Sequence, residues 1–132
     1  ANDIVTQYLT TGNYNPSTSV ATISNAMDVG NPSNFVRILE LFNKEFHSLK
    51  KVMSSYSFSD EATKTILKKV YLNNHYLMDP HGAVGYGALQ QYLEYHAGLK
   101  GIFLETAHPV KFYDVVASVI EKEVPMPGEI KG

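Results

Sequence analysis

Residues 103–112 read Phe103-Leu104-Glu105-Thr106-Ala107-His108-Pro109-Val110-Lys111-Phe112. An apolar run beginning at Gly101 leads into small polar residues, and His108-Pro109 then has the form of a helix start, because proline at the first helical position gives up an N–H that would be unpaired anyway. A continuous apolar run is typical of a strand buried on both faces. Polar ligands of α/β proteins bind past the carboxyl end of such a strand, at the amino end of a helix. We therefore expect a strand at 101–104 and an α/β fold.

A second stretch has the same design. It follows a short candidate strand at 20–23 and reads Ser24-Asn25-Ala26-Met27-Asp28-Val29-Gly30-Asn31-Pro32-Ser33-Asn34. Asn31 is the expected cap of a helix with Pro32 at its first position. Apolar residues continue at steps of three and four and predict one helical face, formed by Phe35, Ile38, Leu39, Phe42, Phe46, Leu49 and Met53.

Three further helices have start signals. Asn2-Asp3 precedes a short helix that Gly12 should end, Ser59 precedes another, and Asp79-Pro80 opens a third. The third begins with closely spaced glycines, which indicates either close packing or close approach of a backbone or a ligand. Two candidate strands are too few for a sheet, so the chain looks like a helix-rich piece of a larger α/β domain, with few parallel strands flanked by helices.

Composition excludes several classes of function. At 132 residues the chain is long enough for one domain, residues 1–132, and its net charge of −2 argues against a nucleic-acid partner. Cysteine is absent, and no apolar run approaches the ~18 residues of a membrane span. We expect a soluble, cytoplasmic protein that is not bound to a membrane. The five histidines have no metal-ligand spacing, and no nucleophile elbow or phosphate loop occurs.

A few side chains remain as candidates for binding. Thr106 stands where an apolar strand ends, and its hydroxyl is either a neutral hydrogen-bond donor to a ligand or a plain strand-end threonine. Ser33 and Asn34 add donors at a helix start, where they either bind an anion or serve only the cap and the turn. Arg37, one turn later, could reach the same anion or pair with Glu40 or Glu45 on the surface. His108 is most simply a cap residue.

These motifs resemble those of threonine synthases, and the resemblance covers nearly the whole chain. Four matching stretches occur in the family's order, of which the second and fourth are highly specific. They are Asn2–Val5 with Thr11-Gly12, residues 21–34, residues 79–85 (Asp-Pro-His-Gly-Ala-Val-Gly) and residues 104–112.

The resemblance implies a fold and a chemistry. The family has the tryptophan-synthase-β-like fold of fold type II pyridoxal-phosphate enzymes, and it converts O-phospho-L-homoserine and water to L-threonine and phosphate. Thr106 corresponds to the threonine whose hydroxyl faces the pyridine nitrogen of pyridoxal 5'-phosphate. A neutral donor there limits protonation of the ring and so tunes its electron withdrawal. Ser33, Asn34 and Arg37 are then the candidate contacts to the small-molecule substrate.

The resemblance also implies that parts of the enzyme lie outside these residues. The family's Schiff-base lysine stands in a Phe-Lys-Asp context and its phosphate loop reads Ser-Gly-Asn-Phe-Gly; neither occurs in this sequence. We expect a carboxy-terminal fragment of a lyase, without a catalytic residue of its own and inactive alone, whose partner is the remainder of the same polypeptide. A fragment of a related enzyme such as threonine dehydratase, or a non-catalytic interaction domain, remains the alternative.

Overall fold

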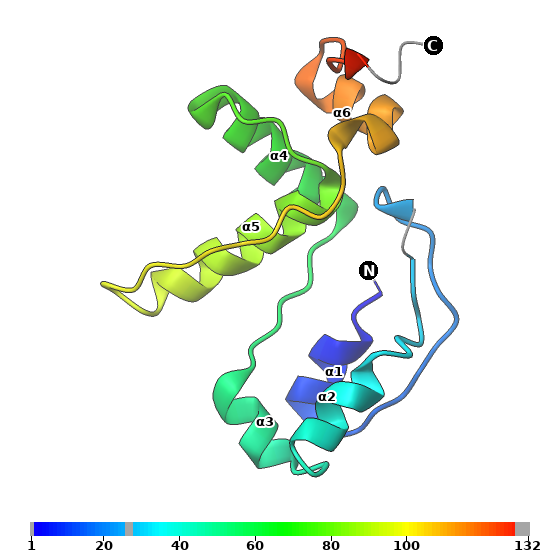
Figure 1. The fold of residues 1–132 in the computed structure, drawn as a ribbon, viewed down its shortest axis with the longest axis vertical. Coiled ribbons are helices and arrows are strands. Elements are labelled where there is room, and N and C mark those ends of the chain that lie inside the picture. The colour runs from blue at the N-terminus through cyan, green and yellow to red at the C-terminus, as the bar shows by residue number, and fades with distance from the viewer. Residues whose placement is uncertain (1, 26–27, 129–132) are drawn as a thin grey trace. The chain divides into compact units, whose positions relative to one another are not determined.

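The computed structural model describes residues 2–25 and 28–128. The chain divides into two compact units, Ala1–Ser57 and Phe58–Gly132, and Figure 1 shows their helices. Every regular element in the described part of the chain is helical, so the helix-rich character was predicted correctly. The few parallel strands that we expected are not formed by these residues. Ala26 and Met27 of the second motif lie outside the described residues.

The first unit begins with α1, Ile4–Thr11, and the predicted stop is confirmed. Gly12 ends the helix in the left-handed conformation with φ of 77°, and its N–H donates to the carbonyl of Tyr8. This conformation strains most other residues, which is why glycine follows so many helices. The helix contributes Tyr8 and Leu9 to a small core that also holds Phe35 and Leu49.

The predicted single helix after Asn31 is wrong, because the segment forms two helices. These are α2, Phe35–Leu41, and α3, Phe46–Val52. Asn43 and Lys44 lie between them with φ of 50° and 60°, values at which a right-handed helix cannot continue. The apolar stripe was nevertheless assigned correctly, since Phe35 and Leu49 both reach the core from their separate helices.

The start of α2 also differs from the prediction. The helix begins at Phe35 rather than Pro32, and the side chain of its cap residue, Asn34, makes no capping hydrogen bond. Asn31 accepts a hydrogen bond from the hydroxyl of Tyr14 instead, over 3.1 Å. Its amide is therefore used to join two loops of the first unit.

The predicted strand at 20–23 is not formed because side chains occupy the backbone groups that a strand would need. Asn2 exchanges two hydrogen bonds of 2.8 Å with the N–H and carbonyl of Val20. Asp28 accepts from the N–H of Thr22 over 3.0 Å and from its hydroxyl over 2.6 Å. A side-chain network thus replaces the ladder of backbone hydrogen bonds that a strand would form, and Asp28 of the second motif belongs to this network.

The second unit contains the other predicted helix starts, and these are confirmed. The helix α4, Asp60–Asn74, is capped by Ser59, whose hydroxyl accepts from the N–H of Ala62 over 3.2 Å. The helix α5, Pro80–Glu94, is capped by Asp79, whose carboxylate accepts from the N–H of His81 over 2.7 Å. The two helices pack against each other (Figure 1).

The last helical segment starts where proline predicted it. A 3-10 turn, η2, Pro109–Phe112, leads directly into α6, Tyr113–Ile120. His108 Nδ1 accepts from the N–H of Val110 over 3.2 Å, so the expected role of His108 as a cap is confirmed. Phe112 then enters the core between α4, α5 and α6, together with Leu67, Met78, Ala83 and Val116.

Residues 101–107 are extended but do not form the predicted strand. They run along α5 in the opposite direction (Figure 1), since Gly101 lies beside Leu89 and Phe103 packs edge-on against Tyr86 at 5.6 Å. No backbone hydrogen bond joins this segment to another of the described residues. A strand is defined by pairing with a neighbour, and the described part of the chain supplies none.

The glycines of α5 make different contacts, and this yields a prediction. A Cβ at Gly87 would lie 2.6 Å from Ile66 Cδ1 and 3.2 Å from the ring of Phe58, whereas one at Gly85 would meet Phe103 at an ordinary 3.9 Å. We expect Gly87→Ala to lower the free energy of unfolding by about 1–3 kcal/mol through overpacking. Gly85→Ala should leave it unchanged or raise it by up to about 1 kcal/mol, the helix propensity gained. Urea unfolding measures both, and equal effects would contradict the packing described.

Candidate functional site

The candidate site lies where residues 104–108 pass the amino end of α5. Exposure alternates along this segment: Leu104, Thr106 and His108 are exposed, whereas Glu105 and Ala107 are half-buried. Such alternation is typical of an extended backbone, in which successive side chains point to opposite faces. Glu105 therefore faces α5, and Thr106 faces away from it.

Thr106 has a free hydroxyl in the described part of the protein. It is exposed, and no hydrogen bond joins its Oγ1 to another described residue. A threonine hydroxyl can donate one hydrogen bond and is uncharged. The residue thus offers a neutral donor at the end of an extended segment.

Glu105 binds the backbone at the start of α5. Its Oε1 accepts a hydrogen bond of 3.0 Å from the N–H of Asp79, which stands 26 residues earlier. Gly82, in the first turn of the helix, makes room for the carboxylate, because a Cβ at that position would collide with Glu105 Oε2. The bond and the gap together hold the carboxyl against the helix end.

Asp79 and His81 complete this polar group. Asp79 is wholly buried, and its Oδ1 lies 2.9 Å from His81 Nδ1 as well as accepting from the His81 N–H. Asp79 Oδ2, His81 Nε2 and Glu105 Oε2 are buried and have no hydrogen-bond partner among the described residues.

The buried position of Glu105 beside another carboxyl explains its raised pKa. Burial, and next the neighbouring carboxyl of Asp79, raise the pKa of Glu105 from 4.5 to about 7. The N–H of Asp79 opposes this shift, because it stabilises the ionised form. Near neutral pH the carboxyl of Glu105 is therefore in part protonated, which lessens repulsion between the two acids.

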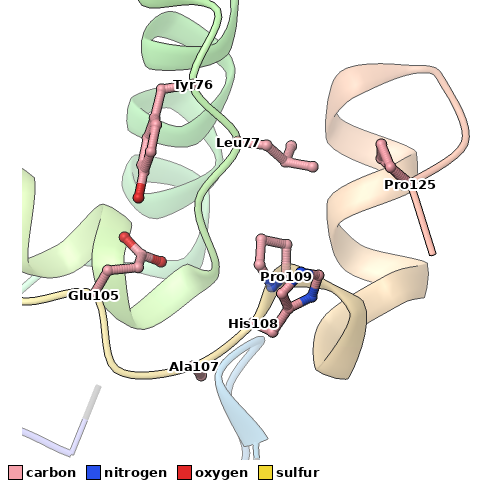
Figure 2. Close-up of a pocket in the computed structure, with 7 residues that line it drawn as sticks. All are labelled: Tyr76, Leu77, Glu105, Ala107, His108, Pro109 and Pro125. Atoms are coloured by element: carbon pink, nitrogen blue, oxygen red, sulfur yellow. The ribbon is translucent and has the colours of Figure 1, made fainter. Parts of the chain in front are cut away.

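An open pocket of about 400 Å³ borders the same segment (Figure 2). Apolar groups form most of its wall, and the hydroxyl end of Tyr76 points towards the Glu105 carboxyl. The lining residues are Tyr76, Leu77, Glu105, Ala107, His108, Pro109 and Pro125. The pocket therefore offers an apolar surface with a few polar ends, as small-molecule sites do.

The other predicted site residues lie in the first unit. Ser33 and Asn34 are exposed in the turn before α2, and Arg37 is exposed on the helix. Arg37 makes no ion pair with Glu40 or Glu45 in the described part of the chain; Glu40 pairs with Lys44 at 2.9 Å. Arg37 and Glu40 instead line a shallow pocket of about 470 Å³ with Val36 and Leu41. The three side chains are thus available to a ligand.

Two other properties of the described residues bear on function. They contain no cluster of three or more side chains that could hold a metal ion. No helix formed by residues 2–25 or 28–128 has the length and apolar character needed to cross a lipid bilayer.

Sequence reasoning missed the group formed by Asp79, His81 and Glu105. Asp79 was identified as a cap and Glu105 as part of a motif, but nothing in their spacing brings them together. An acidic residue directly after the apolar run 101–104 was the available signal, because such a side chain needs a partner if it turns inward.

Comparison with known proteins places these motifs in a family. Residues 82–132 match a family model described as "Threonine synthase, C-terminal". The chain is 41% identical to the threonine synthase of Serratia marcescens over 96% of its own length and 29% of that relative. The chain thus spans about a third of the length of the curated relatives that it matches.

Solved structures have the same fold. Threonine synthase from Escherichia coli matches with a TM-score of 0.88 at 36% identity, over 98% of this chain and 29% of that one. A structure described as PLP-bound threonine synthase from Brucella melitensis matches with a TM-score of 0.73 over 98% of this chain and 32% of that one; at 24% identity this likeness concerns the fold alone.

The titration of Glu105 yields a second prediction. Between about pH 4.5 and about pH 7 the folded protein keeps a proton on Glu105 that the unfolded chain has lost. The folded state then binds more protons, so this group makes the free energy of unfolding fall as the pH rises through that range. We expect Glu105→Gln to remove this part of the slope, measured by urea unfolding from pH 4.5 to 8. Glu94→Gln, at the exposed end of α5, is the matched control; an unchanged slope in Glu105→Gln would contradict the assignment.

Proposed function

Because the chain belongs to the threonine synthase family, we propose that it forms the carboxy-terminal part of a pyridoxal-phosphate-dependent lyase. The enzyme would convert O-phospho-L-homoserine and water to L-threonine and phosphate. The exposed hydroxyl of Thr106, which no described residue engages and which lies within one of the two highly specific motifs, carries this proposal. The relatives named above are threonine synthases, which does not favour a threonine dehydratase or an interaction domain.

The residues present fit pyridoxal phosphate at one point of contact. We assign the pyridine nitrogen of the cofactor to the Thr106 hydroxyl, which no described residue engages. When bound, the cofactor supplies an electron-withdrawing ring that stabilises negative charge on the substrate carbon. Thr106 would contribute a neutral hydrogen bond, which holds the ring without adding a charge beside the nitrogen.

The remaining catalytic groups of the proposed enzyme are expected elsewhere in the polypeptide. No lysine of this sequence stands in a Phe-Lys-Asp context, and no Ser-Gly-Asn-Phe-Gly loop occurs. We therefore propose that the 132 residues do not catalyse the reaction by themselves. Their part is to complete the site by supplying contacts to the cofactor and the substrate.

For the substrate we propose contacts from Ser33, Asn34 and Arg37. All three side chains are exposed, and the guanidinium of Arg37 is not paired with Glu40 or Glu45. A hydroxyl, an amide and a guanidinium together suit a phosphate or carboxylate. The backbone of α2 adds little to this argument, because the helix has only seven residues and starts at Phe35.

The cofactor contact is tested by Thr106→Val in the full-length enzyme. Valine keeps the shape but removes the donor, and an unpaired buried partner costs about 1–3 kcal/mol, so turnover should fall about ten- to hundredfold. The absorption spectrum of the bound cofactor should change as well. Wild-type turnover with an unaltered spectrum would contradict the assignment. The 132-residue chain without the rest of the enzyme is the inactive control in the same phosphate-release assay.

The substrate contacts are tested by Ser33→Ala combined with Asn34→Ala. If these side chains bind the substrate anion, the Michaelis constant for O-phosphohomoserine should rise at least about tenfold, since one lost hydrogen bond to a charged group costs about 1.5–3 kcal/mol. The melting temperature should change little, because both residues are exposed. Reduced stability with an unaltered Michaelis constant would show that the turn is only structural. Arg37→Gln, assayed alongside, reports the contribution of the guanidinium.

A further inference from the structure

We propose that Glu105 is a positioning residue, which ties the segment carrying Thr106 to the amino end of α5 and so fixes where the Thr106 hydroxyl meets the cofactor ring. This inference rests on the proposed function, because it takes Thr106 as the cofactor contact. Glu105 itself would touch neither the cofactor nor the substrate.

Among the described residues, the hydrogen bond between Glu105 and Asp79 is the only one that joins residues 101–107 to another segment. No backbone hydrogen bond links residues 101–107 to another described segment, whereas Glu105 Oε1 accepts from the Asp79 N–H at 3.0 Å. Adjacent residues of an extended chain point to opposite faces. The inward carboxyl of Glu105 therefore sets the outward direction of Thr106.

The surface of α5 is shaped to receive this side chain. Gly82 leaves the space that Glu105 Oε2 occupies, and a Cβ there would collide with it. Two residues earlier on the same face, Phe103 packs edge-on against Tyr86 of α5. The segment is thus held by an apolar contact at Phe103 and by a polar contact at Glu105, next to the candidate cofactor contact.

The groups around Glu105 favour its neutral form. Asp79 meets it at the amino end of α5, and Tyr76 points towards it from the segment before that helix (Figure 2). Burial and Asp79 raise the pKa of Glu105 to about 7. A neutral carboxyl can anchor the segment without placing a full negative charge beside the Thr106 position.

The test compares two replacements in the full-length holoenzyme. Glu105→Leu keeps the approximate size but removes the acceptor for the Asp79 N–H, whereas Glu105→Gln keeps an acceptor oxygen. We expect Glu105→Leu to shift the absorption spectrum of the bound cofactor in the same direction as Thr106→Val. It should also lower kcat about ten- to hundredfold, the loss expected when a group is misplaced by about 1 Å. Glu105→Gln should restore the wild-type spectrum and turnover, and Glu94→Leu is the matched control.

A second pair of variants tests the same contact without removing the carboxyl. Gly82→Ala pushes a methyl group into the space of Glu105 Oε2, while Gly85→Ala makes an ordinary contact on the same helix. Only Gly82→Ala should reproduce the spectral shift of Glu105→Leu. This pair keeps the inference testable if the leucine variant does not fold.

The double variant separates this inference from the proposed function. If Glu105 acts through Thr106, adding Glu105→Leu to Thr106→Val should cause little further loss, because contacts in series are not additive. A wild-type spectrum and kcat in Glu105→Leu, with Thr106→Val still impaired, would overturn the inference and leave the proposed function intact. Full additivity of the two losses would overturn it too. A wild-type enzyme that binds no pyridoxal phosphate would overturn both.

Discussion

The buried carboxyl of Asp79 is the interaction on which the second unit depends. The Oδ1 of this carboxyl caps α5 and contacts the ring of His81. The backbone N–H of the same residue donates a hydrogen bond to Glu105, 26 residues later in the sequence. A wholly buried carboxyl is costly unless polar groups surround it, and His81 brings both its backbone N–H and its ring Nδ1 against Oδ1. The helix start, the pocket wall and the Thr106 segment are therefore ordered around one residue.

The extended segment 101–107 illustrates how a strand depends on its surroundings. Its inward residues pack on α5, but Ile102 and Leu104 are 89% and 78% exposed. These apolar side chains are exposed, and within the described part of the chain the backbone makes no hydrogen bonds to a neighbouring strand. The segment is therefore extended but packed on one face only. The sequence pattern of a buried strand is present, and what is missing from the described residues is a neighbouring strand.

The first unit is held by aromatic contacts rather than by a large core. The ring of Tyr8 meets the rings of Phe35 and Phe46 edge-on at 5.3 and 5.5 Å, and Tyr14 stacks on Phe35 at 5.4 Å. Edge-on aromatic pairs add stability beyond the area they bury. Asn2 and Asp28 then fix the loop around Val20 and Thr22 with side-chain hydrogen bonds, so this polar loop is ordered without regular secondary structure.

The sequence alone determined the helix starts at Ser59, Asp79 and Pro109 and the helix end at Gly12. It also determined the apolar faces that enter each core. Each of these depends on residues within one turn of one another, and the resemblance carried by residues 104–112 likewise needs only the order of side chains. The break at Asn43 and Lys44 could not be predicted, nor could the lack of strand pairing among the described residues. Both depend on how the chain turns and on which partners are near. The meeting of Glu105 with Asp79 was decided only in three dimensions. A hydrogen bond between residues 26 positions apart leaves no periodic trace in the sequence, and it forms because the chain folds back along α5 at the one place where Gly82 leaves room.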